Sequence, residues 1–211
     1  MTKPPPRFIT FEGGEGAGKS TQAKRLAAAL ESCGIPVCAT REPGGSPGAE
    51  QIRALLVEGE PGRWDALAET LLMFAARVDH LVETIHPALA NGAWVICDRF
   101  TDSTYAYQGA GRGLDTQTIA ALETAAVQSF KPDLTFILDV PVETGLSRAG
   151  ARGVHETRFE HFDVDFHGRL RTFFHALAER EPARCVLIDS TVTPDDVAAQ
   201  IWQCVSTRYG T

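Results

Sequence analysis

The 211-residue sequence lacks the features that direct a chain into a membrane or into an oxidising compartment. It has no apolar run of about 18 residues, so it predicts no transmembrane helix. Residues 1–7 are rich in proline and lack the apolar core of a signal peptide. The five cysteines are odd in number and form no C-x-x-C pair, which favours buried, reduced thiols over a disulfide framework. We therefore expect a cytoplasmic protein.

Positive charge is scarce relative to negative charge. The formal net charge of −7 argues against a general nucleic-acid or acidic-membrane binder, because affinity for phosphate backbones comes from clustered Lys and Arg. Any bound anion must therefore be held by a few local cations and by oriented backbone amides. The hydrophobic content of 44% is ordinary for a globular protein, and no internal repeat is present. Residues 1–211 are expected to form a single domain.

Residues 13–20 give the clearest positive signal. They read Gly13, Gly14, Glu15, Gly16, Ala17, Gly18, Lys19 and Ser20, which fits the phosphate-binding pattern G-x-x-x-x-G-K-[ST]. The glycines let backbone N–H groups converge on phosphate oxygens, Lys19 suits the β- and γ-phosphates, and the Ser20 hydroxyl suits Mg²⁺. Such an octet can match by chance, but here a strand-like run precedes it and a helical pattern follows. We expect a site for a nucleoside triphosphate.

Short apolar runs alternate with helical patterns along the chain. Five runs are predicted to be buried strands: Phe8–Phe11, Val37–Thr40, Trp94–Cys97, Leu134–Leu138 and Cys185–Ile188. Helical patterns cover residues 21–32, 65–90, 142–149 and 164–180, and two more begin near 115 and 193. Pro87 is expected to kink or end the second of these helices. The alternation predicts an α/β fold with a parallel sheet and helices on both faces.

Each predicted strand is followed closely by an acidic residue. These residues are Glu12, Glu42, Asp98, Asp139 and Asp189. Ligands of parallel α/β sheets bind beyond the carboxyl ends of the strands, so these acids are expected at the ligand-binding edge.

The P-loop alone does not fix a function, so a second set of residues must discriminate between P-loop proteins. The guanine-reading Asn-Lys-x-Asp motif of GTPases is missing, because the single asparagine, Asn91, is followed by Gly92. The Ser-Gly-Gly-Gln signature of transport ATPases is missing too. Arginines instead lie near predicted strand ends and in the later part of the chain: Arg41, Arg53, Arg77, Arg99, Arg148, Arg152 and Arg158. Such arginines suit a second phosphorylated substrate and the charge that develops in phosphoryl transfer.

Several of these arginines have an ordinary alternative. Arg53, Arg148 and Arg158 could each be a solvated surface residue. Arg41 and Arg99 differ, because each follows a buried-looking strand, where a charge is costly without a partner or ligand.

Motifs along nearly the whole chain resemble the bacterial thymidylate kinase family. Besides the P-loop they are Arg41–Gly45 (Arg-Glu-Pro-Gly-Gly), Phe74–Arg77, Pro87–Gly92, Asp98–Phe100, Ser103–Gly109, Lys131–Leu134 and Arg158–Glu160. The resemblance implies a nucleoside monophosphate kinase-like fold with five parallel strands and a lid at about 148–160. It implies an ATP- and Mg²⁺-dependent kinase that converts dTMP to dTDP and works as a homodimer.

The resemblance also implies residue roles. Arg99 and Arg53 would hold the dTMP phosphate, and Asp98 would help Ser20 to place Mg²⁺. Arg77 would reach the thymine carbonyl, and an aromatic residue, Phe74, would stack on the base. The remaining acceptor-site residues would be Glu42, Ser103, Thr104 and Gln108. In the lid, Arg148 would lie near the adenine.

Arg152 is assigned to the transition state by the resemblance and by one physical argument. Glu15 occupies a loop position from which a cation could reach the transferred phosphate, and an acid there cannot neutralise developing negative charge. A lid arginine can do so, and such a residue can be worth about 10³-fold or more in rate. Lid closure would also exclude water.

Two departures from the family pattern leave alternatives open. Phe74 stands three residues before Arg77, where the family more usually has four, and Met73 holds the four-residue position, so Phe74 could be a core residue. Gly150 stands where relatives often carry another arginine, which leaves Arg148, Arg152 and Arg158 to share the work of the lid.

Other functions remain as alternatives. Another P-loop nucleotide or small-molecule kinase is the nearest, and an ATP-dependent switch is a more distant one. The segment His161–His167 could suggest a metal site, but it lies where a helical pattern begins, which favours ordinary surface residues over ligands.

Overall fold

The computed structural model describes residues 5–60, 62–151 and 158–211. Five parallel strands form one sheet in the order β2-β3-β1-β4-β5. Their bounds are β1 Phe8–Glu12, β2 Val37–Arg41, β3 Trp94–Asp98, β4 Leu134–Asp139 and β5 Cys185–Asp189. Every predicted strand is present, and each runs one residue further than predicted, to an arginine or an acid. The prediction of a parallel α/β fold is confirmed.

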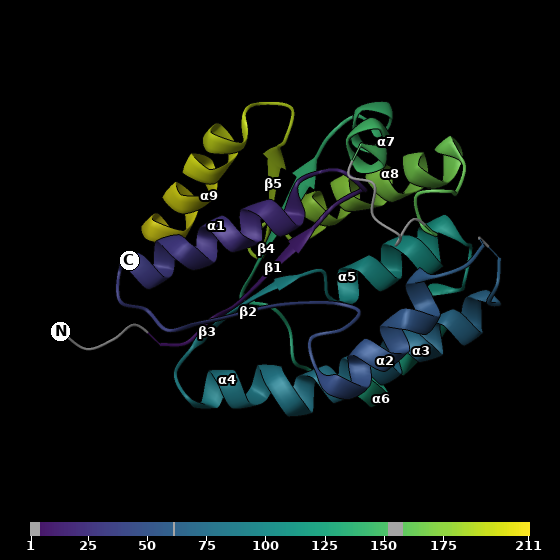
Figure 1. Ribbon diagram of the computed structural model, residues 1–211, viewed down its shortest axis with the longest axis horizontal. Coiled ribbons are helices and arrows are strands. Elements are labelled where there is room, and N and C mark those ends of the chain that lie inside the picture. Colours follow the sequence, from purple (N-terminus) through teal and green to yellow (C-terminus); the bar gives the residue numbers. More distant parts are fainter. Residues whose placement is uncertain (1–4, 61, 152–157) are drawn as a thin grey trace.

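Helices cover both faces of the sheet (Figure 1). On one face lie α1 (Lys19–Ser32) and α9 (Pro194–Tyr209), which pack against each other and against side chains such as Ile9 and Phe11 of β1. The opposite face is covered by α3 (Ala66–His80), α6 (Thr116–Ala126) and α8 (Val164–Arg180). The central strands are therefore buried on both sides, which explains their unbroken apolar runs.

The remaining helical segments connect these layers. They are α2 (Pro47–Val57), packed on α3, together with α4 (His86–Ala90), α5 (Thr101–Thr104), α7 (Val142–Gly150) and two π-helical segments, η1 (Leu81–Ile85) and η2 (Tyr105–Gly111). The sequence patterns did not predict α2, α5 or η2. The latter two carry residues that face a cavity, so their side chains follow no simple apolar period.

The helical path does not end at Pro87, which lies in α4. A π-helical turn, η1, directly precedes α4, and the helical path continues to Ala90. Proline lacks the N–H that an α-helix would pair four residues back, and a local change in helical pairing accommodates that loss.

The five cysteines all lie within the described residues and form no disulfide. Cys97 and Cys185 are buried as expected, but Cys33, at the end of α1, is exposed. None of the described helices combines the length and the apolar character needed to cross a membrane.

Candidate active site

The P-loop joins the end of β1 to the start of α1 at the carboxyl edge of the sheet. At two of its glycines the surrounding backbone leaves no room for a Cβ atom. Gly13 has a φ of +130°, and a Cβ there would lie 2.3 Å from the Leu138 carbonyl oxygen. Gly16 has a φ of +67°, and its Cβ would lie 1.9 Å from the Gly145 carbonyl oxygen. A side chain at either position would force the loop away from β4 or α7.

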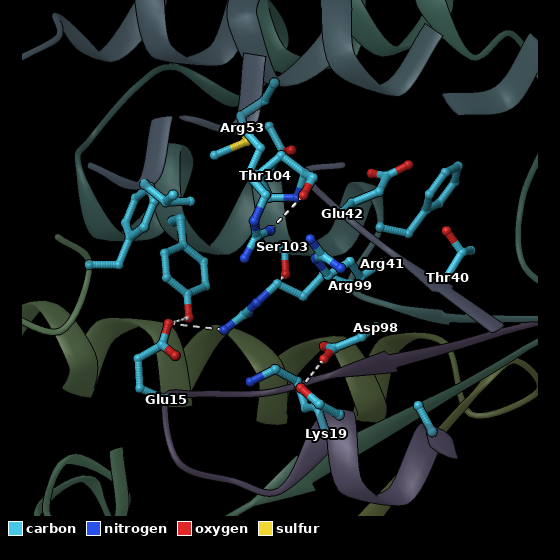
Figure 2. A pocket seen from close by; sticks show the side chains of 18 of the residues that line it. Glu15, Lys19, Thr40, Arg41, Glu42, Arg53, Asp98, Arg99, Ser103 and Thr104 are labelled. Carbon is cyan, nitrogen blue, oxygen red and sulfur yellow. Dashed lines mark hydrogen bonds and ion pairs between the residues drawn. The ribbon is translucent and has the colours of Figure 1, made fainter. Parts of the chain in front are cut away.

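A cavity of about 500 Å³ opens beside this loop. Most of the predicted site residues line it: Glu15, Gly16, Gly18, Lys19, Ser20, Glu42, Arg53, Arg77, Asp98, Arg99, Ser103, Thr104 and Gln108. Gly13, Gly14 and Ala17 belong to the same loop without facing the cavity. Figure 2 shows Arg41, Arg53 and Arg99 directed into one part of the cavity, with Lys19 and Asp98 on the P-loop side.

Arg99 lines the cavity between the P-loop and α5. It follows β3 with a φ of 74°, a left-handed conformation that costs a non-glycine residue free energy. Its Nη1 donates to the Gly13 carbonyl at 3.2 Å and to Ser103 Oγ at 3.1 Å, and its Nη2 donates to Glu15 at 3.0 Å. The guanidinium also lies over the Tyr107 ring, 4.8 Å from its centre. Arg99 is thus held at the rim of the P-loop.

Glu15 and Lys19 both keep their charges at neutral pH. Burial alone would raise the pKa of Glu15, but the charges of Arg99 and Lys19 and the hydroxyl of Tyr107, which donates at 2.7 Å, lower that pKa to about 2. Burial and the charge of Arg99 lower the pKa of Lys19 to about 8. The Lys19 Nζ donates to the Gly14 carbonyl at 2.6 Å, so the cation is folded onto its own loop.

Ser20 and Asp98 lie next to each other close to Lys19, and their oxygen atoms could coordinate a metal ion. The Ser20 hydroxyl donates to Asp98 Oδ2, while Asp98 Oδ1 is buried and has no hydrogen-bond partner in the part of the chain that the structure describes. An orphaned carboxylate oxygen beside a hydroxyl fits Mg²⁺, which prefers hard oxygen ligands and keeps several of its waters.

Arg77 is the second buried arginine of the cavity. It extends from α3, and its side chain is only 2% exposed. Its Nε donates to Glu42 at 2.7 Å, and its Nη2 donates to the Phe100 carbonyl and to Thr104 Oγ1, both at 3.2 Å. The other Glu42 oxygen lies 3.1 Å from His80 Nδ1. Arg77 Nη1 is buried without a partner among the described residues, so its N–H groups remain for a ligand.

Glu42, Thr104 and Gln108 line the cavity, but their polar groups are engaged by neighbouring side chains. Both Glu42 oxygens are engaged by Arg77 and His80, and the Thr104 hydroxyl accepts from Arg77. The Gln108 side-chain amide donates to Glu69 at 2.8 Å. These contacts hold the side chains on this side of the cavity in place.

Arg41 and Arg53 line the cavity together with Arg77 and Arg99. Arg53 Nη1 donates to the Pro43 carbonyl at 2.6 Å. Arg41 pairs with Glu50 at 3.0 Å and is half exposed. Neither is a distant surface residue, because both line the cavity.

The structure places Phe74 differently from the expectation that it stacks on a base. Its side chain is 4% exposed within the hydrophobic cluster around Phe8, and Arg77 lies over its ring at 4.9 Å. Met73, four residues before Arg77, lines the cavity instead. Both Met73 and Phe74 lie within one turn of Arg77, but successive residues point about 100° apart around a helix, so Met73 faces the cavity while Phe74 packs in the hydrophobic cluster.

The three lid arginines have different positions. Arg148 donates to the Ser190 carbonyl at 2.9 Å, and Ser190 donates to the Ala17 carbonyl of the P-loop at 2.8 Å, so Arg148 lies close to the P-loop. Arg158 is fully buried and does not reach the P-loop. It donates to the Leu56 carbonyl at 2.8 Å and pairs with Glu69. Arg152 falls outside the described residues.

Three of the five strand-end acids do not line this cavity. Glu12 is fully buried at the end of β1. Asp139 pairs with Arg171 at 2.8 Å, and Asp189 accepts from the Thr191 backbone N–H and hydroxyl. No group of three or more His, Cys, Asp or Glu side chains in the described part of the chain could hold a metal ion, and His167 lies buried on α8.

Sequence reasoning gave no role to several residues of the cavity. Phe100, Tyr107, Phe159 and Glu160 line it, yet they stood only inside family motifs. Tyr107 could have been considered as one of the two tyrosines, Tyr105 and Tyr107, of the segment that follows Asp98-Arg99-Phe100. No local pattern identifies Phe159, because its position depends on the burial of Arg158.

The chain is similar to known thymidylate kinases over nearly its whole length. The family model described as thymidylate kinase matches residues 11–201. The curated thymidylate kinase of Bradyrhizobium sp. (strain BTAi1) is 54% identical over 208 residues, which covers 97% of this chain and 92% of the relative. That of Caulobacter vibrioides is 55% identical over 203 residues and covers 96% and 97%. The crystal structure of thymidylate kinase from Ehrlichia chaffeensis is 35% identical, with a TM-score of 0.80 over 96% of this chain and 100% of that chain. The chain therefore belongs to the thymidylate kinase family.

Proposed function

We propose that this protein transfers the γ-phosphoryl group of ATP to dTMP and releases dTDP and ADP. The observation that carries the proposal is the single cavity in which the P-loop faces a second anion site built from Arg99, Arg53 and Arg41. One site suits the donor polyphosphate, and the other suits the phosphate of an acceptor. Membership of the thymidylate kinase family supports dTMP as that acceptor.

The reaction needs positioning and charge neutralisation more than covalent chemistry. The ionised oxygen of the dTMP phosphate forms a bond to the γ-phosphorus while the bond to the bridging oxygen of the β-phosphate breaks. Lys19 and the P-loop hold the donor, and Arg99 holds the acceptor against charge repulsion. Fixing the two groups in line accounts for much of the barrier reduction.

Ser20 and Asp98 are the residues that would hold Mg²⁺. When bound, the ion neutralises part of the charge on the phosphates. The orphaned Asp98 Oδ1 and the Ser20 hydroxyl are the oxygen donors that support this assignment.

The free donor of Arg77 is proposed to read a carbonyl oxygen of thymine. Its Nη1 is buried and has no partner among the described residues, while Glu42 holds Nε and the Phe100 carbonyl and Thr104 hold Nη2. Met73 supplies apolar surface beside it.

The lid is proposed to act from the segment at about 148–160. Arg148 lies where it can contact the donor nucleotide, and Arg152 is proposed to reach the transferred phosphoryl group. Arg158 is assigned a different part, because its guanidinium anchors the far end of the lid to α2 and α3.

We also propose that the protein works as a cytoplasmic homodimer. An exposed apolar stripe on α3 and η1 supports the dimer: Leu67, Leu71, Val78 and Val82 are 40%, 49%, 40% and 58% exposed. Their spacing of four, seven and four residues keeps them on one helical face, and such a face suits contact with its own copy.

An acceptor screen tests the proposed function. ADP production from ATP and Mg²⁺ is followed in a coupled assay with dTMP, dAMP, dCMP, dGMP or shikimate as acceptor. A strong preference for dTMP is expected. A different preferred acceptor would identify another kinase, and equal ATP consumption without any acceptor would identify an ATPase or switch.

A further inference from the structure

Glu12 is a buried carboxylate that the reaction itself does not use. It is the last residue of β1 and directly precedes the P-loop, and it is 0% exposed. A buried carboxylate needs hydrogen-bond donors, so its partners indicate what it does.

Both partners of Glu12 belong to the segment around Arg99. One oxygen accepts from the Phe100 backbone N–H at 2.8 Å, and the other accepts from the Ser103 hydroxyl at 2.6 Å. The Ser103 oxygen in turn accepts from Arg99 Nη1 at 3.1 Å. The carboxylate therefore holds the backbone just after Arg99 and, through Ser103, one nitrogen of its guanidinium.

Arg99 needs such support because its own conformation is unfavourable. Its φ of 74° is left-handed, and a strained residue keeps its geometry only where its surroundings fix it. The backbone N–H of Arg99 donates to the Phe11 carbonyl at 2.9 Å, and its Nη1 also donates to the Gly13 carbonyl at 3.2 Å. The strand end at 11–13 thus contacts Arg99 at both ends, and Glu12 lies in the middle of it.

We propose that Glu12 is a positioning residue, which fixes Arg99 relative to the P-loop so that the acceptor phosphate lies in line with the donor. The proposal rests on the proposed function, which gives Arg99 the acceptor phosphate. Glu12 is fully buried and does not line the cavity, so it acts through Phe100 and Ser103.

The charges around Glu12 make this role measurable. Burial and the charge of Asp102 on α5 raise its pKa from 4.5 to about 7, although Ser103, Arg99 and the Phe100 N–H oppose the rise. From other elements, Lys19 on α1, Cys97 on β3 and Cys185 on β5 interact with its charge. Ionised Glu12 can accept both hydrogen bonds fully. Protonated Glu12 loses part of that capacity, so acceptor binding should weaken as the pH falls through about 7.

The test compares kcat/KM for dTMP and KM for dTMP against pH in wild type and Glu12→Gln. The amide cannot ionise and is a poorer acceptor for two donors. We expect the acid limb due to Glu12 to disappear and KM for dTMP at pH 8 to rise about 10- to 100-fold, the effect of weakening hydrogen bonds to a charged group. KM for ATP should change far less. The second ionisation of the dTMP phosphate is common to all variants, so only differences between variants count.

Two further variants keep the test decisive if Glu12→Gln does not fold. Ser103→Ala removes a hydrogen bond that favours ionised Glu12, so the midpoint of the acid limb should move to higher pH. Asp102→Asn removes a repulsive charge, so the midpoint should move to lower pH. Thr10→Val, on the same strand, removes a buried hydroxyl contact to Thr135 at 2.7 Å and should leave the midpoint in place.

The proposal is overturned if Glu12→Gln retains the wild-type acid limb and KM, or if Ser103→Ala and Asp102→Asn leave the midpoint unmoved. Failure of the proposed function is a separate result. It would show as wild-type protein that consumes ATP without regard to dTMP, whatever its pH profile.

Discussion

Replacing Arg77 by leucine should harm stability and substrate binding together, for two separable reasons. The side chains of Arg77 and Glu42 are 2% and 4% exposed, so Arg77→Leu leaves a buried carboxylate without its main partner. Breaking a buried ion pair in this way costs about 3–5 kcal/mol. At about 2–4 °C per kcal/mol for a protein of this size, the melting temperature should fall by roughly 6–20 °C.

The expected effect on dTMP comes from Arg77 Nη1, which has no partner among the described residues and is proposed to bind the base. A hydrogen bond to a charged donor is worth about 1.5–3 kcal/mol, so its loss should raise KM for dTMP roughly 10- to 150-fold. KM for ATP should stay close to the wild-type value, because Arg77 extends from α3 on the acceptor side of the cavity.

The double variant Arg77→Leu, Glu42→Leu separates the two effects. Removing both charges should restore much of the melting temperature, since apolar replacements of a buried pair are often close to neutral. His80 keeps its contact of 2.7 Å with Thr40. KM for dTMP should remain raised. The reasoning fails if the double variant regains wild-type affinity, or if the single variant keeps the wild-type melting temperature.

Further predictions concern the donor site, the lid and the dimer. Lys19→Ala and Arg99→Ala should each abolish useful turnover, and kcat/KM for ATP in wild type should fall above about pH 8, where Lys19 loses its proton. Arg152→Ala should lower kcat and leave dTMP affinity near normal in steady-state kinetics; a rise in the KM for dTMP alone would contradict its assignment. Arg158→Leu should instead lower the melting temperature by several degrees, because it removes a fully buried ion-pair partner. Val82→Glu should shift the protein from dimer to monomer in sedimentation velocity, and an unchanged sedimentation coefficient would place the interface elsewhere.

The strands and the P-loop could be predicted from sequence because their causes are local. A strand buried on both faces needs an unbroken apolar run, and the run Phe8–Phe11 reads directly into Gly13. The glycine pattern is equally local, since Gly13 and Gly16 have no room for a Cβ.

Residues whose role depends on distant partners could not be assigned in the same way. By its position in the sequence Arg158 was expected to work in the lid. Its partners Leu56 and Glu69 lie about a hundred residues earlier, and the fold buries Arg158 against them. Phe74 and Met73 differ by one position on α3, and only the packing of that helix decides which of them faces the cavity. Glu12 was recognised only as a strand-end acid, because its partners Phe100 and Ser103 come from another strand end.

The central claim is that the two anion sites of the cavity hold a donor and an acceptor for direct transfer. Its most direct test follows the label from ATP carrying ³²P in the γ-phosphate, with and without dTMP, in the presence of Mg²⁺. The account predicts that the label appears in dTDP and that transfer depends on dTMP. Label released as inorganic phosphate at the same rate with and without dTMP would contradict it.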